Sequence, residues 1–311
     1  MLKIAVRKLK RKIERFINQR HSYDLPEVNL GWQKVGHSPV YGDQNTGTMF
    51  DPYVFESGDG FKMLVSERET GNLVLVDSID GVHWDNKETL LYGREGKWDP
   101  VVNRGCLLFL NGVWHLWYTG QKNCISAIGY ATSSNGLNFL RKSNSPVIDS
   151  ANCSVMNPCV LWDRLQGKFR MWYSSGEDYE PDVICYAESL DGIHWNNRKE
   201  PVLTIRHDKL WEKYKIGGCT VVPQGNRKLV MYYIGYQNLD VARICVAYSK
   251  DGIVWMRDEE NWILSPSKKS WDAHAVYKPS AIMKSGDIYL WYNGRTGCNE
   301  YIGMAKQSLV K

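Results

Sequence analysis

Short apolar runs that are rich in aromatic residues recur along the chain, and polar residues and glycines separate them. Four runs share a large apolar residue, two aromatic residues and, two positions later, a small residue; a fifth run, residues 62–66, fills the same slot closer to the N-terminus. Runs of this length between turn residues are typical of buried β-strands. The four aromatic runs are Leu116–Gly120, Met171–Ser175, Met231–Gly235 and Leu290–Gly294.

A turn motif, Ser-x-Asp/Asn-Gly-x-x-Trp/Phe, accompanies these runs at nearly constant spacing. Its glycines lie 55, 56 and 60 residues apart. Asp-Gly and Asn-Gly pairs favour tight hairpin turns because both residues tolerate positive φ. The aromatic residue is then expected to pack the strand that follows. The four copies are Ser78–Trp84, Ser133–Phe139, Ser189–Trp195 and Ser249–Trp255.

Each repeat also has an opening segment before its aromatic run. There are five such openings but only four turn motifs, so one outer strand is missing. The segment Trp32–Val40 resembles the residues that follow the turn aromatic in other copies. We therefore expect it to supply the outermost strand of the last repeat. The five openings are Phe50–Pro52, Trp98–Pro100, Met156–Pro158, Ile216–Gly218 and Tyr277–Pro279.

Five four-stranded repeats related in this way predict an all-β fold, a five-bladed β-propeller over residues 28–311. In this arrangement the N-terminal strand completes the last blade. Neither a β-sandwich nor two separate domains would explain why a strand of the last repeat lies at the opposite end of the chain. The 311 residues are 43% hydrophobic, which excludes a disordered chain.

The positive charge is concentrated at the N-terminus. The chain carries a net charge of +5, but residues 1–21 hold eight basic residues and one acid, so the remainder is slightly acidic. We therefore expect no nucleic-acid partner for the globular part. Residues 1–22 are predicted to form a short basic amphipathic helix because apolar residues recur at steps of three and four. That helix would bind an anionic membrane surface; the alternative is a solvated or partner-docked helix.

The spacing of the cysteines and the absence of a signal-like apolar core predict a cytoplasmic location. The eight cysteines form no C-x-x-C pair and lie at no zinc-finger spacing. We expect reduced thiols and no metal site in a cytoplasmic protein, peripheral on the inner face of the membrane.

The first strand of each propeller blade lines the central channel, so the five openings predict one axial cavity. Its candidate lining residues are Asp51, Asp99, Asn157, His274 and Lys278, with Trp98 as a platform for stacking a sugar ring. The loops after the second strands should surround the same cavity. They contribute Glu67, Arg68, Gln121, Glu177, Asp178, Tyr236, Arg295 and Glu300.

The blade pattern, the Asp-Pro pairs at Asp51 and Asp99, and the closing segment Trp291–Gly303 resemble the five-bladed propeller glycosidases. This superfamily includes the arabinanase and xylosidase family 43, the invertase and levansucrase families, and the mannoside phosphorylases. The resemblance implies that Asp51 is a general base and that Asp99 orients the acid and tunes its pKa. The family's acid, a Glu two residues before a proline, is replaced by Met156. Glu177 is the candidate substitute.

The structural alternative is that both Asp-Pro pairs only begin a strand.

A cationic side of the cavity would consist of Arg68, His274, Lys278 and Arg295. These residues could hold phosphate, a nucleotide-sugar diphosphate or an acidic sugar, or could instead pair with nearby acids. No cofactor is required; calcium, which the resemblance allows at the axis, and phosphate are the candidate ions.

The expected function is therefore a glycoside hydrolase-like enzyme that acts on the glycosidic bond of an oligo- or polysaccharide or a sugar donor. One alternative is a glycosyltransferase, transglycosidase or phosphorylase that uses a phosphorylated donor in cytoplasmic assembly of surface polysaccharide. The missing signal peptide, the basic N-terminus and the departure at Met156 favour this alternative. The other alternative is a propeller that binds glycan without catalysis.

Overall fold

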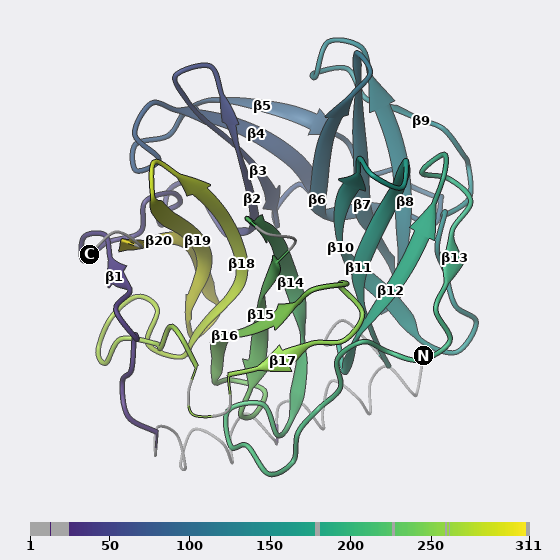
Figure 1. Ribbon diagram of the computed structural model, residues 1–311. Coiled ribbons are helices and arrows are strands. Elements are labelled where there is room, and N and C mark those ends of the chain that lie inside the picture. The colour runs from purple at the N-terminus through teal and green to yellow at the C-terminus, as the bar shows by residue number, and fades with distance from the viewer. Residues whose placement is uncertain are drawn as a thin grey trace.

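The computed structural model describes residue 13 and residues 25–177, 181–225, 228–258, 260 and 262–308. Every element between residues 25 and 308 of this described part is a β-strand, so the predicted all-β class is confirmed (Figure 1). The helix predicted over residues 1–22 lies outside the described residues, residue 13 apart. No described helix is long and apolar enough to cross a membrane.

The strands lie in five runs along the chain. The first comprises β1 (Gln33–Lys34), β2 (Met49–Ser57), β3 (Gly60–Glu67), β4 (Asn72–Ser78) and β5 (Asp85–Leu91). The second comprises β6 (Val101–Leu110), β7 (Val113–Lys122), β8 (Ile125–Ser133) and β9 (Leu140–Arg141). The others comprise β10 (Ser154–Asp163), β11 (Lys168–Gly176), β12 (Val183–Ser189), β13 (Asn196–Asn197), β14 (Lys215–Gln224), β15 (Lys228–Tyr236), β16 (Ala242–Ser249), β17 (Met256–Arg257), β18 (Ala275–Lys284), β19 (Asp287–Thr296) and β20 (Asn299–Ser308).

Antiparallel groups of four strands follow one another along the chain. β2–β5, β6–β9 and β10–β13 each form a separate four-stranded sheet. An eight-stranded sheet holds the remaining strands, with β14–β17 as one half and β18–β20 plus β1 as the other. A single parallel pairing of Ala242 with Ala275 joins the two halves.

The first strands of the groups contact one another in a cycle. β2 contacts β6, β6 contacts β10, β10 contacts β14, β14 contacts β18, and β18 contacts β2 (Figure 1). Apolar clusters fill the space between neighbouring groups; in one of them Trp117 of β7 packs with Phe169 and Met171 of β11. The cycle brings the beginnings of all five first strands to one place.

The predicted N-terminal outer strand is confirmed. β1 pairs antiparallel with β20, with Gln33 opposite Lys306 and Lys34 opposite Ala305. Lys34 anchors this pairing because its ammonium donates to the Ser265 carbonyl (2.6 Å), the Ser267 hydroxyl (2.7 Å) and Asp272 Oδ2 (2.7 Å). Burial lowers the pKa of Lys34, although Asp272 acts in the opposite direction.

The repeated turn motif holds neighbouring groups together. In its first copy the Ser78 hydroxyl accepts a hydrogen bond from the Gly81 amide (2.8 Å), and Asp80 Oδ1 accepts from the Val82 amide (2.8 Å). The Gly81 carbonyl accepts from the indole of Trp291, which belongs to the adjacent group (2.8 Å). Gly81 has φ of 78°, and a Cβ there would lie 2.7 Å from Trp291, so glycine is required.

Candidate active site

A β-bulge interrupts each of the five first strands near its beginning. At each bulge one residue has positive φ, which for a residue other than glycine or asparagine is uncommon and strained. Bulges re-aim side chains and recur next to active sites. The five residues are Asp51 (59°), Arg104 (40°), Asn157 (57°), Gly218 (52°) and Lys278 (52°).

A polar cavity of about 280 Å³ lies over three of these bulges. The starts of first strands, the ends of second strands and the beginning of β20 supply its walls. Among the residues predicted to surround it, the cavity brings together Asp51, Arg68, Gln121, Asn157, Tyr236, Lys278 and Glu300. The other lining residues are Phe50, Val101, Asn103, Thr119, Met156 and Tyr277.

Asp51, Lys278 and Asn157 form the buried centre of this site. The Lys278 ammonium lies 3.3 Å from Asp51 Oδ1 and donates to Asn157 Oδ1 at 2.9 Å. Asp51 Oδ1 is buried and makes no hydrogen bond, so the Lys278 ammonium is the charge that compensates it. The Asn293 side chain fixes the backbone by accepting from the Asp51 amide at 2.7 Å.

Arg68 and Glu300 form a second charged pair at the cavity. Arg68 Nη2 donates to Glu300 Oε2 at 2.9 Å, and the guanidinium lies 4.4 Å from the centre of the Phe50 ring. Burial lowers the pKa of Arg68, but Glu300, Tyr277 and Asp51 together raise it above its usual value. Asp51 and Glu300 are the carboxyl groups among the described lining residues.

Amide and hydroxyl groups complete the lining. Asn103 donates to Gln121 Oε1 (2.5 Å), and the Thr119 hydroxyl accepts from the Asn157 amide (2.9 Å). Asn103 Oδ1 is buried and makes no hydrogen bond. Asn103 and Thr119 were not among the predicted site residues. They lie opposite each other on β6 and β7, and each directly precedes a residue of a repeated position, Arg104 or Gly120, which is the signal that could have identified them.

Asp99 does not line the cavity. It precedes β6, is fully buried, and accepts hydrogen bonds from Arg94 Nε (2.9 Å), Arg141 Nε (2.8 Å) and the Tyr118 hydroxyl (2.9 Å). The expectation that Asp99 opens the second repeat at the position equivalent to Asp51 is wrong, because the bulge and its positive φ fall at Arg104.

The setting of Asp99 recurs in two other groups of strands. Glu212 accepts from the Tyr233 hydroxyl at 2.9 Å and lies 3.5 Å from Arg257 Nε. Asp272 accepts from Lys34 and from the Tyr292 hydroxyl, at 2.7 and 3.2 Å. Each acid follows a tryptophan, and each pairs with a cation of the outermost strand. This recurrence indicates that the three acids hold the outermost strand of each group to the strands beside it.

Trp98 packs on the strands instead of facing the cavity. Its ring stacks on Tyr118 with centroids 6.0 Å apart and an interplanar angle of 14°. A Cβ at Gly120 would lie 2.2 Å from this ring, so the close approach requires glycine.

Glu67 is also not among the residues that line the cavity. Its carboxylate accepts hydrogen bonds from Lys87 (2.7 Å) and Thr70 (2.6 Å). Burial raises the pKa of Glu67, but the hydrogen bonds from Lys87 and Thr70 and the charge of Lys87 together lower it by more, so the pKa is below its usual value.

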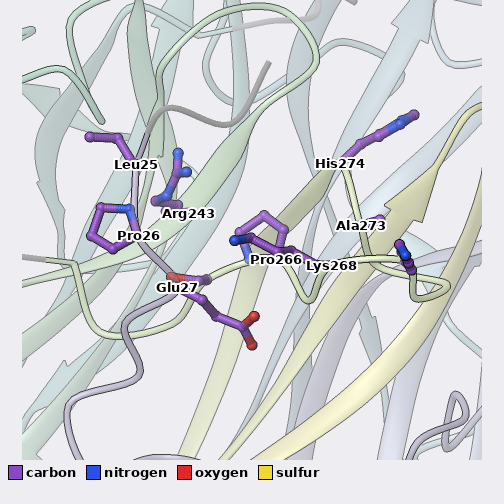
Figure 2. A pocket seen from close by; sticks show the side chains of 10 residues that line it. Leu25, Pro26, Glu27, Arg243, Pro266, Lys268, Ala273 and His274 are labelled. Atoms are coloured by element: carbon purple, nitrogen blue, oxygen red, sulfur yellow. The ribbon is translucent and has the colours of Figure 1, made fainter.

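His274 and Arg295 lie outside the cavity as well. His274 lines a different cavity of about 340 Å³, together with Arg243, Lys268 and Glu27 (Figure 2). Burial and the charge of Arg295 lower the pKa of His274, against the effect of Asp240. Arg295 Nη2 donates to the carbonyls of Leu239 (3.2 Å) and Asp240 (2.8 Å).

Glu177, the expected substitute acid, is exposed just after β11 and is not among the lining residues. Asp178 lies outside the described residues. Met156, at the position of the family's acid, does line the cavity and is buried. No group of three or more His, Cys, Asp or Glu side chains within the described residues could hold a metal ion.

Comparisons with known proteins bear on the fold and the family of the chain. Residues 74–216 match the model of the glycosyl hydrolases family 32 N-terminal domain. An uncharacterized protein of Mycobacterium tuberculosis (strain CDC 1551 / Oshkosh) is 29% identical over 267 residues, which are 77% of this chain and 87% of the relative.

A 1,2-beta-oligomannan phosphorylase of Thermoanaerobacter sp. (strain X514) is 25% identical over 232 residues, 70% of this chain and 72% of the relative. A solved glycoside hydrolase structure superposes with a TM-score of 0.73 at 17% identity, covering 96% of this chain and 97% of that chain. The predicted resemblance to the propeller glycosidase superfamily, with relatives among hydrolases and phosphorylases, is therefore confirmed.

Proposed function

We propose that this protein is a carbohydrate-active enzyme that cleaves or forms a glycosidic bond in the cavity around Asp51. The observation that carries the proposal is a buried carboxylate oxygen that makes no hydrogen bond, held beside Lys278 in a cavity lined by amides and hydroxyls. Such groups hydrogen-bond sugar hydroxyls, and a carboxyl group is the usual proton-transfer group at a glycosidic bond.

In this proposal Asp51 and Glu300 are the two carboxyl groups that serve the reaction. In hydrolysis, water attacks the anomeric carbon and gives a proton to Asp51, while the bond from that carbon to the leaving oxygen breaks. The leaving oxygen takes a proton from the second carboxyl group. Glu300 is the candidate, and it must leave its ion pair with Arg68 and be protonated when the substrate is bound. Asn103, Asn157 and Gln121 would orient the sugar by hydrogen bonds.

Phosphorolysis is the second candidate, and the two cations at the cavity favour it. Arg68 and Lys278 line the space beside Asp51, and cations at such a site bind phosphate oxygens well. Phosphate would then attack the anomeric carbon, and the products would be a sugar 1-phosphate and a shortened glycan. The similarity to a 1,2-beta-oligomannan phosphorylase supports this candidate.

The cycle of contacts among the first strands also supports the finer prediction for the fold. We infer that the five groups of four strands are the blades of a five-bladed β-propeller and that the cavity lies on its axis.

The test is turnover by the purified full chain. Aryl glycosides and oligosaccharides, including β-1,2-linked mannosides, are incubated with and without phosphate, and released sugar and sugar 1-phosphate are quantified. Asp51→Asn should lower kcat by about 10²- to 10⁴-fold. Asp77→Asn, at a surface pair with Lys62, is the control and should leave kcat unchanged. Full activity of Asp51→Asn, or no turnover of any substrate, would refute the proposal.

A further inference from the structure

Arg104 occupies the bulge position of the second group, where other groups have Asp51, Asn157 and Lys278. Those three residues line the cavity, whereas Arg104 is not among its lining residues. Arg104 is only 3% exposed, and its amide donates to the Ser66 hydroxyl of β3 at 2.9 Å. A cation is therefore buried among the first strands, close to a cavity whose centre is an ion pair.

The guanidinium of Arg104 connects two other bulges. Its Nη2 donates to the carbonyls of Cys219 and Pro279, both at 3.1 Å. Cys219 directly follows the bulge residue Gly218, and Pro279 directly follows Lys278. One side chain of the second group thus fixes the backbone of the fourth and fifth groups at the residues beside the cavity.

The Pro279 contact bears directly on Lys278. Lys278 holds a strained φ of 52°, and its ammonium contacts Asn157 of the third group and Asp51 of the first. Pro279 has no amide to donate, so its carbonyl is the hydrogen-bonding backbone group of that residue. A hydrogen bond from a charged guanidinium is about twice as strong as a neutral one. The Pro279 carbonyl belongs to the peptide between Pro279 and Ser280, so such a bond restrains the backbone directly after the Lys278–Pro279 peptide.

We propose that Arg104 is a positioning residue, which holds the Lys278–Pro279 bulge so that the ammonium stays on Asp51 and Asn157. This inference rests on the proposed function for its kinetic consequence, but its structural consequence is independent of it. A displacement of about 1 Å of a reacting group can lower a rate about 10²-fold. Loss of Arg104 should therefore act mainly on kcat, because Arg104 is not among the residues that line the substrate cavity.

The test uses Arg104→Met and Arg104→Lys in the full chain. Crystal structures of the variants report whether Lys278 still contacts Asn157 and Asp51. Steady-state kinetics on the best substrate report kcat and KM separately. Arg104→Met should lose the Lys278–Asn157 contact and lower kcat by about 10- to 100-fold, with the KM for the glycan changed less than about threefold. Arg104→Lys, which keeps the charge, should recover part of the loss.

Arg243→Met is the matched control, because it also removes a buried guanidinium. Arg243 lies on β16 and is not among the residues that line the cavity around Asp51. An unmoved Lys278 in Arg104→Met, or an equal loss of kcat in Arg243→Met, would overturn the inference while leaving the proposed function intact. If the wild-type chain turns over no substrate, the proposed function fails, and the crystal structures still decide the role of Arg104. If neither Arg104 variant folds, Arg104 serves the fold as a whole and the positioning role is refuted.

Discussion

Replacing Lys34 by methionine should destabilise the protein strongly, although Lys34 belongs to a strand of two residues. The substitution removes hydrogen bonds to Ser265, Ser267 and Asp272, and Asp272 is 1% exposed. Removing one partner of a buried ion pair usually costs about 3–5 kcal/mol because the other charge stays buried.

The structure places the expected cost near the lower end of this range. Asp272 keeps the Tyr292 hydroxyl at 3.2 Å and the Ser267 amide at 3.3 Å, and the variant no longer buries an ammonium. We therefore expect a loss of about 3 kcal/mol in the free energy of unfolding. For a chain of 311 residues, an unfolding entropy of about 2.1 cal/mol/K per residue converts this loss into a decrease in Tm of about 5 °C.

Urea denaturation and calorimetry of Lys34→Met measure this effect. Lys62→Met, which breaks the surface pair with Asp77, is the control and should cost no more than about 1 kcal/mol. The double variant Lys34→Met/Asp272→Asn should lose less free energy of unfolding than the two single variants lose together, because it removes the buried uncompensated charge. Equal stability of Lys34→Met and Lys62→Met would refute the reasoning.

Two further predictions concern residues that the structure places outside the cavity. Asp99→Asn leaves Arg94 and Arg141 without their carboxylate and should cost about 3–5 kcal/mol in urea denaturation, with kcat of the folded variant nearly unchanged; a selective loss of kcat would contradict this. His274 has a folded pKa below its usual 6.5, so the folded state binds fewer protons than the unfolded state, and stability present above pH 6.5 is lost as the pH falls toward the folded pKa. His274→Gln should therefore lose less stability than the wild type between pH 7 and pH 5, and equal losses in urea titrations would exclude this role.

The strand pattern could be predicted from sequence because its signals are local. The Ser-x-Asp-Gly turn needs only its own hydroxyl, carboxylate and glycine, so the residues that make the turn are consecutive. The displaced strand β1 could be predicted because one outer strand was missing from an otherwise regular repeat. Asp51, Asn157 and Lys278 could be located because each precedes a proline in an opening segment.

The error at Asp99 shows why the remainder of the site was harder to predict. Asp99-Pro100 has the same two residues as Asp51-Pro52, but Arg104 lies thirteen residues before Trp117, as Lys278 lies thirteen before Trp291. In the other copies with an aromatic run the bulge residue lies thirteen to fifteen residues before the first aromatic residue, whereas Asp99 lies eighteen before Trp117, so this spacing would have excluded Asp99. The predicted position of the Glu177 side chain depended on the conformation of a loop. No periodicity in the sequence constrains where an exposed loop directs its side chains.

The pairing of β1 with β20 has a consequence for the order in which the protein can assemble during synthesis. Residues 33–34 emerge from the ribosome early, but their partners, residues 305–306, are made more than 260 residues later. Contacts this distant in sequence are slow to form because they close a long loop. The group that contains β18–β20 can therefore reach its four-stranded form only after residues 299–308 have been synthesised. A ribosome that stalls before residue 299 would release a chain in which β19 exposes unpaired backbone groups, the kind of edge from which aggregation begins.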